Sequence, residues 1–143
     1  MPYQFIEEIA GGDVAFEATG KSMEELCIAM AEATMNVMVE DLEKIRHQVE
    51  ISFNVEHNEF DLLLFKFLNE LIFIKDSKRL LVRIEKVILG KKESLLTLEA
   101  RGYGELLDPK RHQLLVDVKA VTLHCFQVKQ NDEGWEATVV LDV

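Results

Sequence analysis

The 143-residue sequence is poor in the residues that cross-link or anchor a chain. Its two cysteines, Cys27 and Cys125, lie far apart among apolar neighbours and form no CxxC pair. We therefore expect two reduced core thiols in a reducing cytosol rather than one disulfide, and the spacing excludes redox and metal-thiolate sites. No segment approaches the roughly 20 apolar residues of a membrane span, and no basic start precedes an apolar stretch. These absences predict a cytoplasmic protein that does not bind membranes.

Positive charge is also scarce, because 26 acidic residues against 16 basic ones give a net charge of −10. Such a surface repels a nucleic-acid backbone, so we expect no direct binding to nucleic acid. It favours cations or a basic patch on another protein, although an acid excess can also serve only to keep a protein soluble. Conventional catalytic motifs (GxSxG, P-loop, GxGxxG, HExxH) are missing too. We therefore expect no enzyme of the standard kinds.

Linkers, repeats and low-complexity tracts are absent, which predicts one domain over residues 1–143. Ser22 and Glu25 form an S-x-x-E capping box that opens a helix. Residues 60–76 are apolar on so many sides that we expect the more buried helix there. Alternating or β-rich stretches predict strands near 13–18, 48–56, 80–89, 93–101, 115–128 and 134–143. Helices early and strands late indicate an α+β fold, with two helices packed on a mostly antiparallel mixed β-sheet.

The four histidines show no metal-ligand spacing. We expect His47, His57 and His112 at the surface or in capping positions. His124 lies in a stretch dense in β-forming residues, where a histidine is either a hydrogen-bonded core residue or lines a site. In an unbroken strand Lys119 lies on the face opposite His124, so the two reach one site only if a bulge shifts the register between them.

The chain closes on an apolar strand pattern, WEATVVLDV, that runs to the last residue. Alternation places Val143 on the apolar face and Asp142 on the other face. A strand packed to its end holds the Asp142 carboxylate beside the terminal carboxylate, and two anions 4 Å apart repel by roughly 4 kcal/mol at a dielectric near 20. Oxygen ligands without sulfur or imidazole suit hard ions such as Ca²⁺ or Mg²⁺. The alternative is a solvated tail without a ligand.

Four blocks of the sequence resemble motifs of the archease family, in the same order, from about Phe5 to Val143. The most specific block, YGELLDPKRHQLLVDVKAVTLH, is similar to G-E-x-L-D-x-x-R-H followed by V-K-A-V-T-Y-H. DVAFEATGKSMEEL resembles D-V-G-I-R-A-Y-G-K-T-L-E-E, and LLLFKFLNELIF resembles L-L-x-x-W-L-N-E-L-L-Y. The closing WEATVVLDV resembles W-x-A-x-V-I-L-D-I.

This resemblance implies an accessory protein that activates the GTP-dependent RNA ligase joining tRNA halves and other broken RNAs. Such a protein promotes ligase guanylylation and multiple turnover without making or breaking the RNA bond. The resemblance implies metal ligands at Asp13, Asp142 and Val143, for a divalent ion that we expect to be Ca²⁺, with Mg²⁺ or Mn²⁺ as alternatives. Lys119 and His124 match further family positions, for which we expect roles in partner binding or activation.

Two other functions stay open at this point. One is a chaperone-like modulator of other RNA-processing enzymes, such as tRNA methyltransferases. The other is a metal-dependent phosphoryl-transfer enzyme, in which Asp13 and Asp142 would hold the ion. The chain also departs from the family where D-H-T-A-D-V is common, since it reads IAGGDV over residues 9–14. The missing aspartate and histidine predict weaker metal binding or a different partner.

Overall fold

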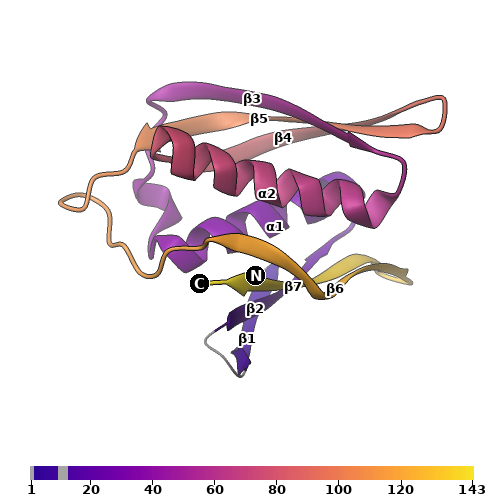
Figure 1. Ribbon diagram of the computed structural model, residues 1–143, viewed down its shortest axis with the longest axis horizontal. Helices are drawn as coiled ribbons and strands as arrows, with labels where there is room; N and C mark the ends of the chain where they lie inside the picture. The colour runs from indigo at the N-terminus through magenta and orange to yellow at the C-terminus, as the bar shows by residue number, and fades with distance from the viewer. Residues whose placement is uncertain (1, 10–12) are drawn as a thin grey trace.

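The computed structural model describes residues 2–9 and 13–143, with side chains for 2–6 and 13–143. Two antiparallel sheets enclose the helices (Figure 1). One sheet has the strand order β1-β2-β7-β6 and the other β3-β5-β4. The strands are β1 (Tyr3–Ile9), β2 (Asp13–Gly20), β3 (Val49–His57), β4 (Leu80–Lys92), β5 (Leu95–Leu106), β6 (Ala120–Asn131) and β7 (Gly134–Asp142). The α+β class is confirmed, but the helices lie between two sheets rather than on one.

The first helix, α1 (Met23–Met38), begins at the predicted capping box. The Ser22 hydroxyl accepts the N–H of Glu25 at 3.1 Å, and the Glu25 carboxylate accepts the N–H of Lys21 at 2.8 Å. This satisfies two backbone donors near the start of the helix. A short 3₁₀ helix, η1 (Leu42–Lys44), follows.

The second helix, α2 (Phe60–Lys78), is less buried than α1, contrary to the prediction. Ten of the 16 residues of α1 are buried, against eight of the 19 in α2. Both helices contact both sheets, but α1 packs on the central strands β2 and β7 of the four-stranded sheet, whereas α2 meets that sheet mainly at its edge strand β6. On α2 the side chain of Phe73 is 61% exposed. The apolar composition of α2 correctly predicted a helix that packs in the core. It did not predict how much of the helix surface the sheets cover.

The stretch from residue 107 to 119 crosses from the end of β5 to the start of β6 and joins the two sheets (Figure 1). The predicted strand over 115–128 therefore begins later, at Ala120. Cys125 is exposed, so the prediction of a core position for it was wrong, whereas Cys27 is buried. The reason is that Cys125 lies where the register between β6 and β7 shifts, with a φ of 58°.

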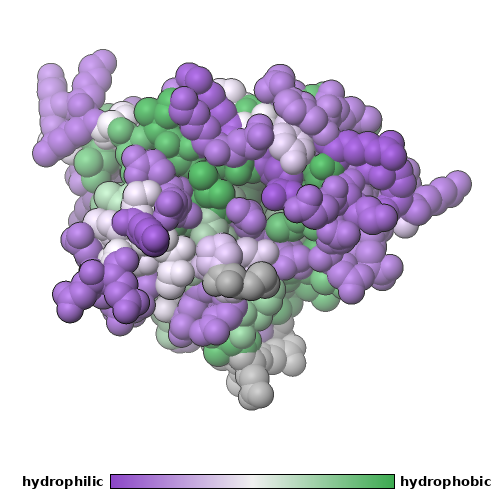
Figure 2. Space-filling view, turned by 180° about the vertical axis from the view of Figure 1, so that it is seen from behind, coloured by the Kyte–Doolittle hydropathy of each residue, from purple (hydrophilic) through white to green (hydrophobic). Residues whose placement is uncertain are grey.

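Hydrophilic residues cover most of the face seen in Figure 2, and hydrophobic residues show between them as smaller areas. The buried core lies inside, around Phe16, Met30, Phe67 and Leu98.

Within the part of the chain that the structure describes, we find no helix with the length and apolarity that crossing a membrane requires.

Candidate functional site

The predicted site lies where β2 begins and β7 ends. In the antiparallel β2–β7 pair, Val14 lies opposite Leu141. Continuing this register by one residue brings Asp13 opposite Asp142, and such neighbours have Cβ atoms roughly 5 Å apart. We call Asp13, Asp142 and Val143 the acidic tip. The fold thus brings residues from opposite ends of the chain together where the two central strands of the sheet end.

Close to the acidic tip, residues on both faces of the β2–β7 pair are buried. On the face toward the helices, Phe16 and Val139 are fully buried. On the other face, where the sequence predicts a solvated side, Ala15 and Val140 are each 1% exposed. Packing on both sides opposes fraying, which is the usual behaviour of a chain end. The carboxylate of Asp142 is therefore held by a rigid strand.

Lys119 lies beside the tip through its backbone. Its N–H donates to the carbonyl oxygen of Asp142 at 2.8 Å, and Ala120 pairs with Asp142 in the β6–β7 ladder. Among residues 2–6 and 13–143, no lysine, arginine or histidine forms an ion pair with Asp13 or Asp142. Among the described residues, neither carboxylate is therefore neutralised by a side-chain ion pair.

His124 lies in a bulge of β6. Thr122 lies opposite Val140, and the next pair in the register is Gln127 opposite Thr138. Four residues of β6, 123–126, therefore correspond to a single residue of β7, Val139. A register shift is the condition for a site shared by Lys119 and His124, and the shared site itself stays a prediction. The side chain of His124 is exposed, so of the two alternatives for this residue the core position is excluded, and the bulge is the reason. Its role in activation stays a prediction.

The donors at the acidic tip fit a hard cation, because they are all carboxylate oxygens. Within the described residues, no three His, Cys, Asp or Glu side chains group closely enough to hold a metal ion. The metal ligands predicted from the sequence are two aspartates, Asp13 and Asp142, and the terminal carboxylate of Val143. Residues 10–12, where the sequence departs from the family pattern, lie outside the described residues.

The first part of the most specific sequence block forms a buried polar cluster around Glu105. Glu105 is 5% exposed and accepts hydrogen bonds from the N–H of Arg46 and from the side chains of Arg111 and His112. Burial alone raises the pKa of Glu105, but these bonds outweigh it and lower the pKa to about 2. His112, expected at the surface or as a cap, is buried, and its Nδ1 accepts the N–H of Asp108 at 3.0 Å. The cluster fixes the path of the chain as it leaves β5.

Of the other two histidines, His57 caps a backbone N–H and His47 lies at the surface, as expected. The His57 Nδ1 accepts the N–H of Glu59 at 2.9 Å, just before α2 begins. The ring of His47 is exposed and stacks on Tyr103 with the centroids 4.7 Å apart.

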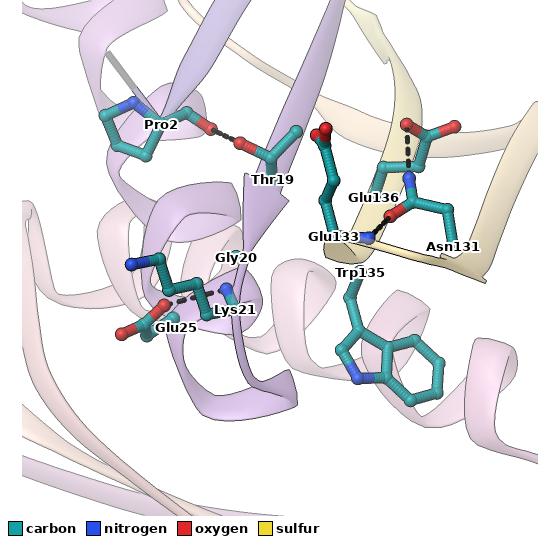
Figure 3. Close-up of a pocket in the computed structure, with 9 residues that line it drawn as sticks. All are labelled: Pro2, Thr19, Gly20, Lys21, Glu25, Asn131, Glu133, Trp135 and Glu136. Atoms are coloured by element: carbon teal, nitrogen blue, oxygen red, sulfur yellow. Dashed lines mark hydrogen bonds between the residues drawn. The ribbon is translucent and has the colours of Figure 1, made fainter.

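A surface cavity of about 500 Å³ lies at the far end of the same strands (Figure 3). There Gly20 pairs with Trp135, seven residues along the register from the tip, or roughly 23 Å. Figure 3 shows the Trp135 indole turned away from Glu133 and Glu136, and its ring packs 5.7 Å from that of Phe60. Glu136 is already bound by Asn131 and Lys129. This cavity is therefore separate from the acidic tip.

The same fold and sequence pattern occur in known proteins. A family model described as the Archease protein family (MTH1598/TM1083) matches residues 3–143. The chain belongs to the archease family. Protein archease of Pyrococcus furiosus is 33% identical over 132 residues, 92% of each chain. Protein archease of Sulfolobus acidocaldarius is 30% identical over 141 residues, covering 99% of this chain and 98% of the other.

Solved structures agree with this membership. The solution structure of Methanobacterium thermoautotrophicum protein 1598 superimposes with a TM-score of 0.86 at 29% identity, covering 99% of both chains. The crystal structure of a Thermotoga maritima archease, described as a possible chaperone, gives a TM-score of 0.54 at 20% identity. It covers 96% of this chain and 94% of that one, and supports the archease fold alone.

Three polar residues that the sequence did not single out for a site have defined contacts in this archease. They are Asn69 and Lys75 on α2 and the buried Glu105. A signal was present for Asn69, since it interrupts a strongly apolar helix, and a polar residue in such a place needs a partner. Lys75 ends the apolar run, so its signal was weaker. What it could not indicate was which distant segment supplies that partner.

Proposed function

We propose that this archease is an accessory protein that activates a GTP-dependent RNA ligase in tRNA splicing and RNA repair. In this proposal it promotes guanylylation and multiple turnover of the ligase and does no chemistry on RNA itself. The acidic tip, with its divalent ion, enters the metal-dependent nucleotide site of the ligase. Lys119 and His124 contact the ligase around the tip.

The observation that carries the proposal is the β2–β7 register, in which Val14 lies opposite Leu141, so that Asp13 and Asp142 are the next residues along the two strands. Three carboxylates held on rigid strands repel one another unless a cation neutralises them. A bound divalent ion would supply positive charge beside the phosphate groups of the nucleotide in the ligase site, and the residues of the acidic tip would hold and orient the ion. The net charge of −10 adds attraction toward a basic nucleotide site on a partner.

The test is a guanylylation assay with the cognate ligase, GTP, Mn²⁺ and an RNA that ends in a 3′-phosphate or a 2′,3′-cyclic phosphate. We expect the purified chain to raise the rate and the number of turnovers, and Asp13→Asn and Asp142→Asn to lose at least about 90% of the effect. Glu136→Gln is the matched control, because Glu136 lies on the same strand at its far end. Failure of the intact chain to stimulate the ligase would contradict the proposal.

A chaperone-like role is the second candidate, because the Thermotoga maritima relative is described as a possible chaperone. It predicts that the chain suppresses aggregation of an RNA-processing enzyme such as a tRNA methyltransferase. An aggregation assay with Asp142→Asn separates the two functions, since only the ligase proposal requires that carboxylate.

A further inference from the structure

Two polar side chains of α2 reach the short stretch that carries Lys119. The Oδ1 atom of Asn69 accepts the N–H of Val121 at 3.1 Å. Six residues further along the helix, the Lys75 ammonium donates to the carbonyl oxygen of Val118 at 3.1 Å and pairs with the Asp117 carboxylate. These bonds join segments that are 52 and 43 residues apart in sequence. They are therefore tertiary contacts rather than local caps.

The backbone groups that these side chains bind lie at the open side of the four-stranded sheet. Strand β6 is its edge strand, so groups on the outer side of the stretch have no further strand to pair with. Asn69 and Lys75 satisfy them there. On the inner side, the Lys119 N–H bonds the carbonyl oxygen of Asp142. Residues 118–121 are therefore held between α2 and the last residues of β7.

Lys75 is an unusual residue for this place, because its side chain is only 5% exposed. Burial lowers the pKa of Lys75, but hydrogen bonds to Asp117 and Asp76 outweigh it and raise the pKa, so the group is charged at neutral pH. An apolar residue of similar volume often stabilises a core as well as a buried ion pair does. Helix packing alone therefore does not explain a lysine here, whereas its contact with Val118 and Asp117 does.

We propose that Asn69 and Lys75 are positioning residues that hold residues 118–121 against the end of β7 and so keep Lys119 and Asp142 in the arrangement that the partner recognises. This inference rests on the proposed activator function. Neither residue touches the partner or the ion itself. Both act through the backbone next to the acidic tip.

The first test separates the acceptor atom of Asn69 from its packing. Asn69→Asp keeps the Oδ1 acceptor, while Asn69→Leu keeps the size and loses the acceptor. Both variants lose the Nδ2 donor that bonds the Phe65 carbonyl oxygen at 3.2 Å, so this bond does not account for a difference between them. We expect Asn69→Leu to lower the hydrogen-exchange protection of the Val121 and Lys119 amides by about tenfold. We expect its maximal ligase stimulation at saturating activator to fall by about tenfold. Asn69→Asp should keep both properties, which a role in packing alone does not predict.

The second test uses a control lysine on the same helix. Lys66 also donates to a backbone carbonyl, that of Glu56 at 3.0 Å, but Glu56 lies on β3, away from the tip. Lys75→Met should reduce maximal stimulation by about tenfold, and Lys66→Met should leave it unchanged. Lys75→Arg, which keeps the charge and the donors, should restore part of the effect.

The outcomes distinguish this inference from the proposed function. A wild-type chain that does not stimulate the ligase overturns the proposed function and the positioning roles with it. A wild-type chain that stimulates, together with folded Asn69→Leu and Lys75→Met variants that stimulate equally well, overturns the positioning roles alone. If Asn69→Leu does not fold, equal stimulation by Lys75→Met and Lys66→Met is the contradicting result.

Discussion

Cys27 and Cys125 have similar sequence neighbours and opposite environments. Burial raises the pKa of the Cys27 thiol to about 12, with a smaller contribution from Glu24, so this thiol stays protonated and unreactive. Cys125 is exposed in the bulge. We expect a native thiol titration with Ellman's reagent to detect one thiol per chain and a titration in denaturant to detect two. A native Cys125→Ser variant should give none, and rapid labelling of that variant would contradict this assignment.

Glu105 makes the free energy of unfolding depend on pH in the acidic range. Its folded pKa of about 2 lies below the ordinary value of 4.5, so the unfolded chain takes up a proton first as the pH falls. The stabilisation is present above about pH 4.5 and is lost as the pH falls toward 2. We expect Glu105→Gln to lower the free energy of unfolding by about 2 kcal/mol at pH 7 and by less at pH 3. Urea unfolding at both pH values measures this, and an equal loss at both would show that charge is not the cause.

Among the elements, β4 and β5 depend on one close backbone approach. A Cβ added to Gly102 would lie 1.9 Å from the carbonyl oxygen of Arg83, next to the register shift between Ile84 and Lys86. At Gly104, on the same strand, the nearest atom would be 3.1 Å away. We expect Gly102→Ala to cost about 3 kcal/mol and Gly104→Ala about 1 kcal/mol. Thermal unfolding of both variants tests this order, and a smaller loss for Gly102→Ala would contradict it.

Most helices and strands were predicted from the sequence because a helix cap or a strand alternation depends on residues that are neighbours in the chain. The Ser22 capping box, the α2 segment and the terminal strand all appear where the sequence indicates them. Strand β1 was missed, since its residues pair with β2 without clear alternation. The start of β6 was misplaced, and its bulge was not predicted, for a different reason. They are set by contacts with α2 and β7, which no window of neighbouring residues contains.

At the scale of the whole molecule, the sequence predicted the residues of the tip through the family resemblance and predicted the packed final strand from its alternation. It could not predict that the strand next to β7 would be β2 with Val14 opposite Leu141, because register depends on how two distant strands meet. For the same reason it could not predict two sheets around the helices. Asn69 and Lys75 became interpretable only once α2 was seen beside residues 118–121.

The closeness of the chain end to β2 gives a prediction of its own. Adding Gly-Ser after Val143 moves the terminal carboxylate away by up to about 7 Å but leaves Asp13 and Asp142 in place. We expect metal affinity and ligase stimulation to fall by about tenfold with little change in the melting temperature. The same dipeptide at the N-terminus is the control, because Pro2 bonds Thr19 at the far end of β2. Unchanged affinity in the C-terminal extension would exclude the Val143 carboxylate as a ligand.

The central claim is that the acidic tip holds a divalent ion, and Mn²⁺ tests it most directly because Mn²⁺ scatters anomalously. Crystals of the chain soaked in Mn²⁺ should show an anomalous peak within coordination distance of carboxylate oxygens from Asp13, Asp142 and Val143. The peak should disappear in Asp142→Asn crystals. A peak elsewhere on the molecule, or none at a concentration that saturates the ligase, would contradict the account.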